Sequence, residues 1–249
     1  MKLLEIHRLN KSFGGLKATH DLSLAFDAGE MSSIIGPNGA GKTTLFNLLT
    51  GYLKPDSGSI LYKGRDIAGL PHYKISRLGI NRSFQRSHVC ASLTAFENVR
   101  ASILSKKKRT FRLLSNLAAM KDVEQETYRI LEDINLREVA HTPATQLAHG
   151  DVKSLDIGMA LAMEPEIALL DEPTAGMGAG DRFRIMELIR GLWEKRHLTI
   201  VFVEHDMDVV FSFSQKVRVL SYGSLIADGT PEEVSQNQEV IEAYLGQDY

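Results

Sequence analysis

Cysteine is almost absent from this chain of 249 residues, and long apolar runs are absent altogether. The single cysteine, Cys90, permits no internal disulfide, which fits a reducing compartment. The longest apolar runs, such as 200–203, are far too short to span a bilayer. Charged residues arrive too early in the opening MKLLEIHRLNKSF for a signal peptide. We therefore expect a protein that reaches a membrane only through a partner.

An excess of either charge is also missing. The formal net charge is -2, which gives no bulk electrostatic reason to expect nucleic acid as the main partner. Hydrophobic residues make up 43% and charged residues 24%, as in ordinary soluble globular chains. The chain is long enough for one domain, or for one domain with a subdomain. No internal repeat or low-complexity linker divides it.

Short strands and helices alternate along most of the chain. MSSIIG, EIALLD, LTIVFVE and KVRVLSYG have the apolar character of strands, and helical patterns lie between them. This alternation predicts an α/β fold with a mainly parallel sheet. Residues 86–160 have a helical pattern and are predicted to be an insertion. Near the N-terminus, LEIHRL and LSLAF are predicted to be strands, with GGLKATHD as the loop between them.

The segment GPNGAGKTT lies between a predicted strand and a predicted helix. It matches G-x-x-x-x-G-K-[ST], in which glycines let backbone N–H groups surround an anion and the helix adds its positive N-terminal end. Lys42 would reach the β- and γ-phosphates of a nucleotide, and the Thr43 hydroxyl would bind Mg²⁺. The alternative interpretation is a plain glycine turn. The residues expected to bind the nucleotide here are Gly36, Asn38, Gly39, Ala40, Gly41, Lys42, Thr43 and Thr44.

Two carboxylates, Asp171 and Glu172, stand at the end of another predicted strand. Taken alone, such a pair is ordinary surface. Beside a phosphate-binding loop, one acid can hold Mg²⁺ and the next can polarise a water for attack on the γ-phosphate. His205 follows the strand LTIVFVE, so a third strand-to-helix junction would bring it to the same edge of the sheet.

The motifs GPNGAGKTT, SFQ, LLDEPTAG and VFVEHDM follow one another in that order. Together they resemble the ATP-binding subunits of ABC transporters, over nearly the whole chain. EHDM, DIGMAL, the arm at 105–140 and the ending ADGTPEEV are similar to the subgroup that serves branched-chain amino acid and urea or amide importers. The resemblance implies a P-loop NTPase of ABC type, with an antiparallel β subdomain beside the core sheet. It divides a single nucleotide-binding domain, 1–249, into a core (1–85 and 161–249) and a helical subdomain (86–160) that carries the signature.

The resemblance also assigns roles to individual residues. Phe13 would stack on adenine, although a lone phenylalanine at a strand end can also be an ordinary core residue. Gln85 would sense Mg²⁺ and the transmembrane partner, unless it is a solvated loop residue. Glu172 would be the catalytic base, and His205 would contact the γ-phosphate. The expected catalytic residues are thus Lys42, Gln85, Glu172 and His205, and the expected metal ligands are Thr43, Gln85 and Asp171.

In the family that the chain resembles, two subunits enclose two ATP molecules head to tail, and each ATP is completed by the other subunit's L-S-G-G-Q signature at a helix N-terminus. LAHGD stands at that position here. Gly150 matches the motif, but Ala148 lacks the serine hydroxyl and His149 replaces a glycine. Backbone N–H groups of these three residues can still bind phosphate. Asp151 replaces the glutamine, and its carboxylate would repel a phosphate. Gly178 is a second departure, because the family usually has an acid or amide there.

The resemblance implies ATP and Mg²⁺ as cofactors and an importer motor as the function, with branched-chain amino acids, urea or short amides as the solute. The implied partners are a second ATPase subunit, identical or related, transmembrane permease subunits and, indirectly, a solute-binding protein, but no nucleic acid. The implied location is peripheral, on the cytoplasmic side of the cell membrane. Two other functions stay open. An ATP-binding regulatory half would fit the altered signature but not the intact Glu172 and His205. A soluble ABC-type ATPase acting on DNA would need a long coiled-coil insertion or a basic surface, and the sequence has neither.

Overall fold

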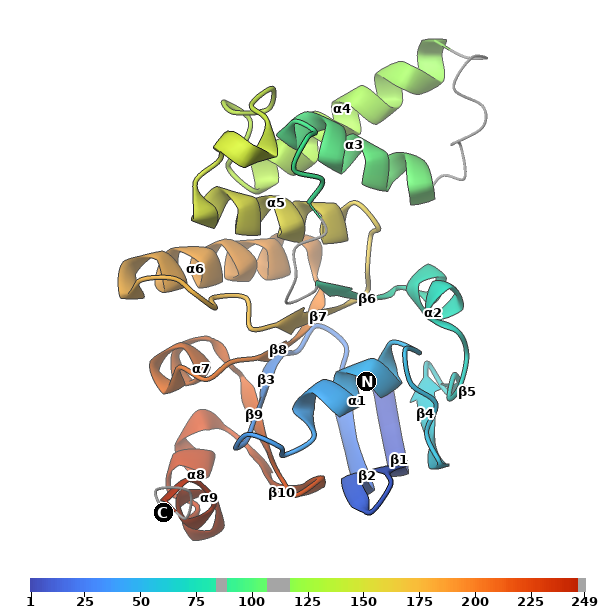
Figure 1. The fold of residues 1–249 in the computed structure, drawn as a ribbon, viewed down its shortest axis with the longest axis vertical. Coiled ribbons are helices and arrows are strands. Elements are labelled where there is room, and N and C mark those ends of the chain that lie inside the picture. The colour runs from blue at the N-terminus through green and yellow to red at the C-terminus, as the bar shows by residue number, and fades with distance from the viewer. Residues whose placement is uncertain (84–88, 107–116, 246–249) are drawn as a thin grey trace.

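A six-stranded sheet forms the centre of the protein in the computed structural model, which describes residues 1–83, 89–106 and 117–245 (Figure 1). Five of its strands are parallel, and β10 pairs with β9 in the antiparallel direction. Every residue of β3, β7 and β8 is buried, as expected for central strands with helices on both faces. The prediction of a mainly parallel core sheet is confirmed. In spatial order the strands are β10 (Ser224–Gly229), β9 (Lys216–Ser221), β3 (Met31–Ile35), β8 (Thr199–Val203), β7 (Ile167–Asp171) and β6 (Ile80–Ser83).

A second, antiparallel sheet has the order β2-β1-β4-β5. The two long strands β1 and β2 turn at Gly14 and Gly15, so the prediction of a longer loop over GGLKATHD was wrong. Register shifts between the two strands interrupt the regular alternation of buried and exposed residues, which hid the start of β2 in the sequence. The strands are β1 (Lys2–Phe13), β2 (Leu16–Asp27), β4 (Ser57–Tyr62) and β5 (Arg65–Asp66).

Helix α1 (Lys42–Leu49) packs between the two sheets. Its side chains Leu45, Phe46 and Leu49 are fully buried in a cluster with residues of β1, β2, β7 and β8. The helix is followed by Gly51, whose φ of 72° is typical of a C′ glycine. Because α1 packs against both sheets, the helix that follows the loop is held in place.

The predicted helical insertion contains α3 (Ala95–Lys106), α4 (Leu117–Asp133) and α5 (His149–Leu161). A capping box precedes α3, because the Glu97 carboxylate accepts from Thr94 N at 2.8 Å and Thr94 Oγ1 accepts from Glu97 N at 3.2 Å. Figure 1 shows this helical layer stacked above α6. At the end of α4, Asp133 binds Lys195 and Arg196 of α6, each at 2.5 Å, and so ties the insertion to the core.

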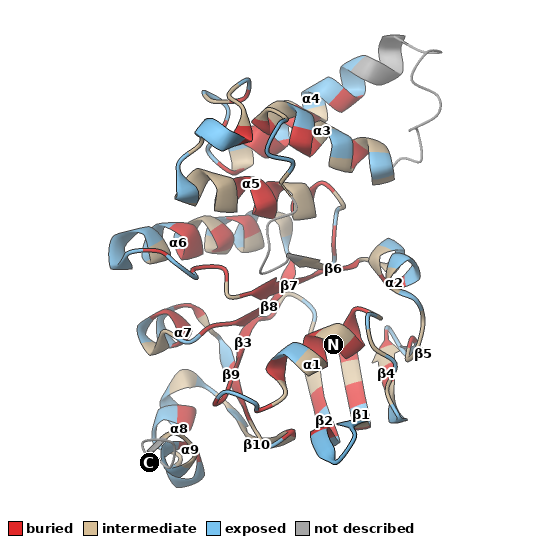
Figure 2. Ribbon diagram, viewed as in Figure 1, coloured by how far each residue is buried: buried red, intermediate tan, exposed pale blue. Residues whose placement is uncertain are grey.

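The remaining helices cover the edges and outer faces of the sheets. Figure 2 shows the contrast between the buried strands of the six-stranded sheet and the mixed burial of the helices around it. Thr230 caps α8, with Glu233 completing a capping box and Pro231 opening the helix. These helices are α2 (His72–Leu78), α6 (Ala179–Arg196), α7 (Met207–Phe213), α8 (Pro231–Ser235) and α9 (Gln238–Leu245).

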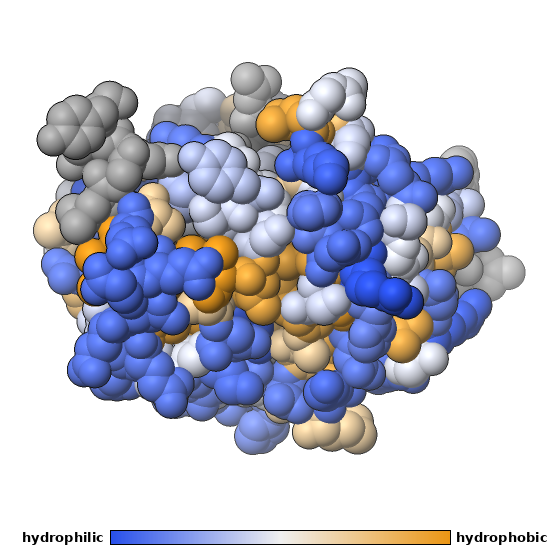
Figure 3. Space-filling view, turned by 90° about the horizontal axis from the view of Figure 1, so that it is seen from below, coloured by the Kyte–Doolittle hydropathy of each residue, from blue (hydrophilic) through white to orange (hydrophobic). Residues whose placement is uncertain are grey.

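Figure 3 views the molecule from below the orientation of Figure 1, and the surface on that side is mainly hydrophilic. Figure 3 shows apolar residues there only as a limited band between hydrophilic ones. Among residues 1–83, 89–106 and 117–245, none of the helices has the length and the apolar character needed to cross a bilayer.

Candidate functional site

The loop between β3 and α1 has a backbone that only glycine can follow at two points. Gly36 has φ 150° and Gly41 has φ 100°. A Cβ at Gly36 would collide with the carbonyl oxygen of Leu220, and one at Gly41 would collide with that of Ala18. Helix α1 begins directly after Gly41 without a side-chain cap. Its first N–H groups therefore remain available to an anion held by the loop.

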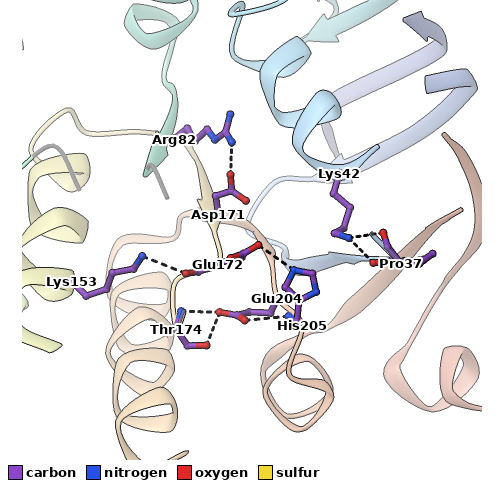
Figure 4. Close-up of polar contacts among 10 residues, drawn as sticks. Pro37, Lys42, Arg82, Lys153, Asp171, Glu172, Thr174, Glu204 and His205 are labelled. Carbon is purple, nitrogen blue, oxygen red and sulfur yellow. Dashed lines mark hydrogen bonds and ion pairs between the residues drawn. The ribbon is translucent and has the colours of Figure 1, made fainter. Parts of the chain in front are cut away.

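Lys42 lies over this loop, with only 8% of the residue exposed. Its Nζ donates to Gly36 O at 2.5 Å and to Pro37 O at 3.0 Å (Figure 4). Burial lowers the pKa of Lys42, and the carboxylates of Glu172 and Asp171 oppose that shift. The lysine thus shares one electrostatic environment with the two acids, although they come from a distant part of the sequence.

Asp171 is the last residue of β7 and is 1% exposed. Its carboxylate forms an ion pair with the guanidinium of Arg82 in β6, the neighbouring strand (Figure 4). Arg82 also donates to Asn47 Oδ1 of α1 at 2.7 Å. Sequence reasoning did not identify Arg82. The available signal was a cation within the short segment GINRSF, but its partner could not be read from the sequence.

Glu172 and His205 face each other across adjacent strands. The distance from Glu172 Oε1 to His205 Nε2 is 3.1 Å, and both side chains reach solvent (Figure 4). Strands β7 and β8 end side by side, with Asp171 paired to Val203, which explains why these residues meet. The structure therefore brings together the predicted residues Lys42, Asp171, Glu172 and His205 at one edge of the parallel sheet.

Glu172 also has an unusual backbone. Its φ is 48°, in the left-handed region that L-residues rarely adopt. The Glu172 N–H donates to Val203 O at 2.9 Å, and the Glu172 carbonyl oxygen accepts from Lys153 Nζ at 3.3 Å. The turn directs the side chain away from the strand and toward His205. Strain of this kind is commonly found where a functional group is held in place.

The other residues predicted to contact the nucleotide lie in the same loop, at the start of α1, at the end of β1 or outside the described residues. Asn38, Gly39 and Thr43 are exposed, whereas Ala40 is buried. Phe13, at the end of β1, is 47% exposed, and Lys11 Nζ lies 5.7 Å from the centre of its ring. The ring is thus open to a stacking partner rather than buried in the core. Thr44 is partly buried. Gln85 falls outside the described residues.

The altered signature lies apart from the residues around the β3–α1 loop. Ala148 is the N-cap of α5, His149 is its first residue, and no side chain caps the helix. His149 Nε2 would lie 3.6 Å from a Cβ on Gly176, so the signature adjoins the turn that follows β7. Gly178, the second departure, is the N-cap of α6 with φ -69° and ψ 159°. Figure 1 shows the start of α5 well away from the β3–α1 loop of the same chain.

The residues present suit Mg²⁺ only if a bound phosphate supplies further ligands. No cluster of three or more His, Cys, Asp or Glu side chains suited to a metal ion occurs within the described residues. Mg²⁺ in nucleotide sites commonly takes one or two protein ligands, phosphate oxygens and water. Asp171 and Thr43 satisfy that smaller requirement, and Asp171 would have to exchange or share its ion pair with Arg82.

Comparisons with known proteins agree with this geometry. A family model described as ABC transporter matches residues 19–175, and one described as branched-chain amino acid ATP-binding cassette transporter matches residues 224–249. The chain is 40% identical to the high-affinity branched-chain amino acid transport ATP-binding protein LivG of Salmonella typhimurium and 38% identical to BraF of Pseudomonas aeruginosa. Each alignment covers 98% of both chains.

Solved structures show the same fold. The crystal structure of the ADP conformation of an ABC transporter cassette matches with a TM-score of 0.87 and 29% identity, over 99% of this chain and 100% of that one. A dimeric cassette in a post-hydrolysis state, bound to ADP and Pi, matches with a TM-score of 0.76 and 25% identity, over 92% and 98%. The chain belongs to the ABC transporter family and is an ATP-binding cassette of the kind that supplies transport ATPase subunits.

Proposed function

We propose that this protein is the ATP-hydrolysing motor of an importer for branched-chain amino acids. The observation that carries the proposal is the meeting of Lys42, Glu172 and His205 beside a loop shaped for phosphate. Lys42 would bind the β- and γ-phosphates. Glu172 would accept a proton from the attacking water, and His205 would hold the γ-phosphate and orient Glu172.

The cofactors of this reaction are ATP and Mg²⁺. Thr43 and Asp171 would hold the metal, with Gln85 as a third contributor, and Mg²⁺ would neutralise charge that develops on the phosphates. Phe13 would stack on adenine, since its ring is open to solvent at the end of β1. The loop residues from Gly36 to Thr44 would donate backbone N–H groups to the phosphates.

The working unit is a head-to-tail dimer, with an identical or a related subunit. The dimeric neighbour bound to ADP and Pi supports this arrangement. It also gives a role to Ala148, His149 and Gly150, which lie far from their own loop and would contact the ATP of the opposite subunit. The dimer would sit under transmembrane permease subunits on the cytoplasmic face of the membrane, and a solute-binding protein would deliver the solute.

The choice of solute rests on the relatives, because solute contacts belong to other chains. LivG and BraF carry branched-chain amino acid transport in their names, and the C-terminal family model does so too. The test is uptake of leucine, isoleucine, valine and urea by vesicles that contain the purified transporter. We expect leucine, isoleucine and valine to be taken up with ATP and to stimulate hydrolysis. Urea uptake alone would overturn the choice of solute, and uptake without ATP would overturn the motor role.

A regulatory half with weak hydrolysis is the second candidate, and the altered signature at 148–151 favours it. The two functions differ in the turnover of this chain's own ATP. If a dimer whose partner has a disabled phosphate loop still hydrolyses ATP, the motor function stands. If hydrolysis is lost when the partner's loop is disabled but continues when this chain's loop is disabled, this chain is the regulatory half.

A further inference from the structure

A buried acid without a described cation partner lies directly beside His205. Glu204, the residue after β8, is 5% exposed. Its Oε1 accepts from Thr174 N at 2.8 Å and from Thr174 Oγ1 at 2.7 Å, and its Oε2 accepts from His205 N at 3.2 Å (Figure 4). Within the described part of the chain, no basic side chain pairs with this carboxylate. These three hydrogen bonds connect the turn after Glu172 with the backbone of His205.

Stability alone does not explain an acid at this position. Burial of a carboxylate is unfavourable, and hydrogen bonds from neutral donors offset that penalty only in part. An apolar side chain at Glu204 would avoid the burial of a charge but would leave the Thr174 and His205 donors without this acceptor. What an apolar residue could not do is hold Thr174 and His205 at the same time. The carboxylate thus has a geometric consequence that a packing residue lacks.

The turn that Glu204 holds is the strained one. Glu172 adopts φ 48°, and a left-handed conformation is unfavourable for an L-residue, so the neighbouring contacts must maintain it. One such contact is Glu172 N to Val203 O at 2.9 Å, before the turn. Thr174 to Glu204 is the corresponding contact after it. Glu172 therefore lies between two attachments to the end of β8.

A second attachment lies on the other side of His205. Asp206 forms an ion pair with Arg182, and Arg182 Nε donates to Met177 O at 2.9 Å. The segment after Glu172 is thus tied to both sequence neighbours of His205. A small displacement of that segment would change the 3.1 Å distance between Glu172 Oε1 and His205 Nε2.

We propose that Glu204 is a positioning residue for hydrolysis, which fixes Glu172 against His205 by binding Thr174 and the His205 backbone. The proposal rests on the proposed function, in which Glu172 is the general base. Glu204 is buried and its hydrogen bonds go to Thr174 and to the His205 backbone, so we expect its effect in the rate of the chemical step rather than in ATP binding.

The main variant is Glu204→Gln, which keeps the shape but replaces one acceptor oxygen with a donor NH₂ group that would face a backbone N–H. We expect kcat to fall about tenfold, the loss for a misplacement well under 1 Å of a reacting group. The Kd of ATP and the midpoint of thermal unfolding should stay near their original values. Glu194→Gln, the same change at an exposed position of α6, is the control.

A second variant tests the connection itself. Thr174→Val removes the hydroxyl contact and keeps the backbone contact, so a smaller loss of kcat is expected. If Glu204 acts through Thr174, the double variant should be no slower than Glu204→Gln alone. Multiplicative losses in the double variant would overturn the proposal. So would an unchanged kcat in Glu204→Gln, or a fall in ATP affinity and in thermal stability that parallels the loss of rate.

Failure of the proposed function gives a different result. Glu172→Gln with normal turnover would remove Glu172 from its role, whatever Glu204→Gln does. Glu172→Gln without turnover, combined with normal turnover in Glu204→Gln, would overturn the positioning role alone.

Discussion

Arg82 and Asp171 form an ion pair whose side chains are only 6% and 2% exposed. Asp171 ends β7, and Arg82 lies in β6 and also reaches Asn47 on α1. The pair thus links two strands to the helix that follows the phosphate loop. It gives the carboxylate expected to hold Mg²⁺ a cation from its own chain.

Removal of this cation should destabilise the fold. Arg82→Met keeps an apolar stem but leaves the Asp171 carboxylate buried without its ion pair, so the free energy of unfolding should fall by about 3 kcal/mol. Chemical denaturation without nucleotide measures the change. Adding Asp171→Asn should restore much of the loss, because the broken pair then leaves no unpaired buried carboxylate. An additive loss in the double variant would contradict the prediction.

Lys42→Ala should weaken ATP binding as well as turnover. The ammonium group offers charge-assisted hydrogen bonds to the phosphates, so its loss should raise the Kd of ATP at least about tenfold. The nucleotide-free protein should stay as stable, because burial disfavours the charged lysine and lowers its pKa. Calorimetry at fixed Mg²⁺ measures the affinity. The exposed Lys121 gives a matched control, and equal affinities of Lys42→Ala and Lys121→Ala would disprove the role.

Glu172→Gln should bind ATP and almost cease to hydrolyse it. A general base contributes at least about 100-fold to a rate, and glutamine keeps the size of the side chain without accepting a proton. The assay is phosphate release from the complete transporter, alongside the Kd of ATP. Hydrolysis within a few fold of the original rate would assign the base to another residue.

The signature predicts an unequal pair of ATP sites. This chain's own loop is complete, whereas Asp151 lies in the first turn of α5, where a partner's γ-phosphate would bind. Ala148→Ser with Asp151→Gln should accelerate a homodimer several fold and change a mixed dimer with a fuller signature much less. Ala148→Ser alone is the control, because serine also improves the N-cap. If the double variant accelerates neither dimer, LAHGD is already competent.

The link between α4 and α6 should respond to pH. Burial raises the pKa of Asp133, but Lys195 and Arg196 outweigh that effect, so its pKa lies below the ordinary value of 3.8. A lowered acid pKa stabilises the fold above about pH 4, and this contribution is lost as the pH falls through the folded-state pKa.

Asp133→Asn should therefore reduce the free energy of unfolding by about 1 kcal/mol at pH 7, a modest amount because Lys195 is solvated. Unfolding curves between pH 7 and pH 2.5 test this, with the exposed Asp122→Asn on the same helix as control. The two variants should converge in stability at the acidic end. A constant difference across the range would contradict the assignment.

The parts of the protein that a local pattern defines could be predicted from the sequence. A glycine-rich turn between an apolar strand and a helix located Lys42, and two apolar strands ending in polar residues located Asp171, Glu172 and His205. Since parallel strands end at one edge of a sheet, their sequence positions also implied that they meet.

Pairings between distant residues could not be predicted. Arg82 and Glu204 are charged residues next to apolar runs, and their partners Asp171 and Thr174 lie 89 and 30 positions away. The backbone of Glu172 was equally hidden, because no residue-type preference signals a left-handed glutamate. The short turn at Gly14 was missed for a local reason, since the register shifts of β1 against β2 remove the alternation that marks a strand.

The backbone at Gly178 does not need a glycine. Its φ is -69°, and an added Cβ would meet no atom within 4 Å. As the N-cap of α6, the position even favours aspartate or asparagine, by a few tenths of a kcal/mol over glycine. An acid or amide at this position would therefore meet no clash at its Cβ. The choice of residue here is open to drift or to selection for function, because the fold itself imposes no barrier in either direction.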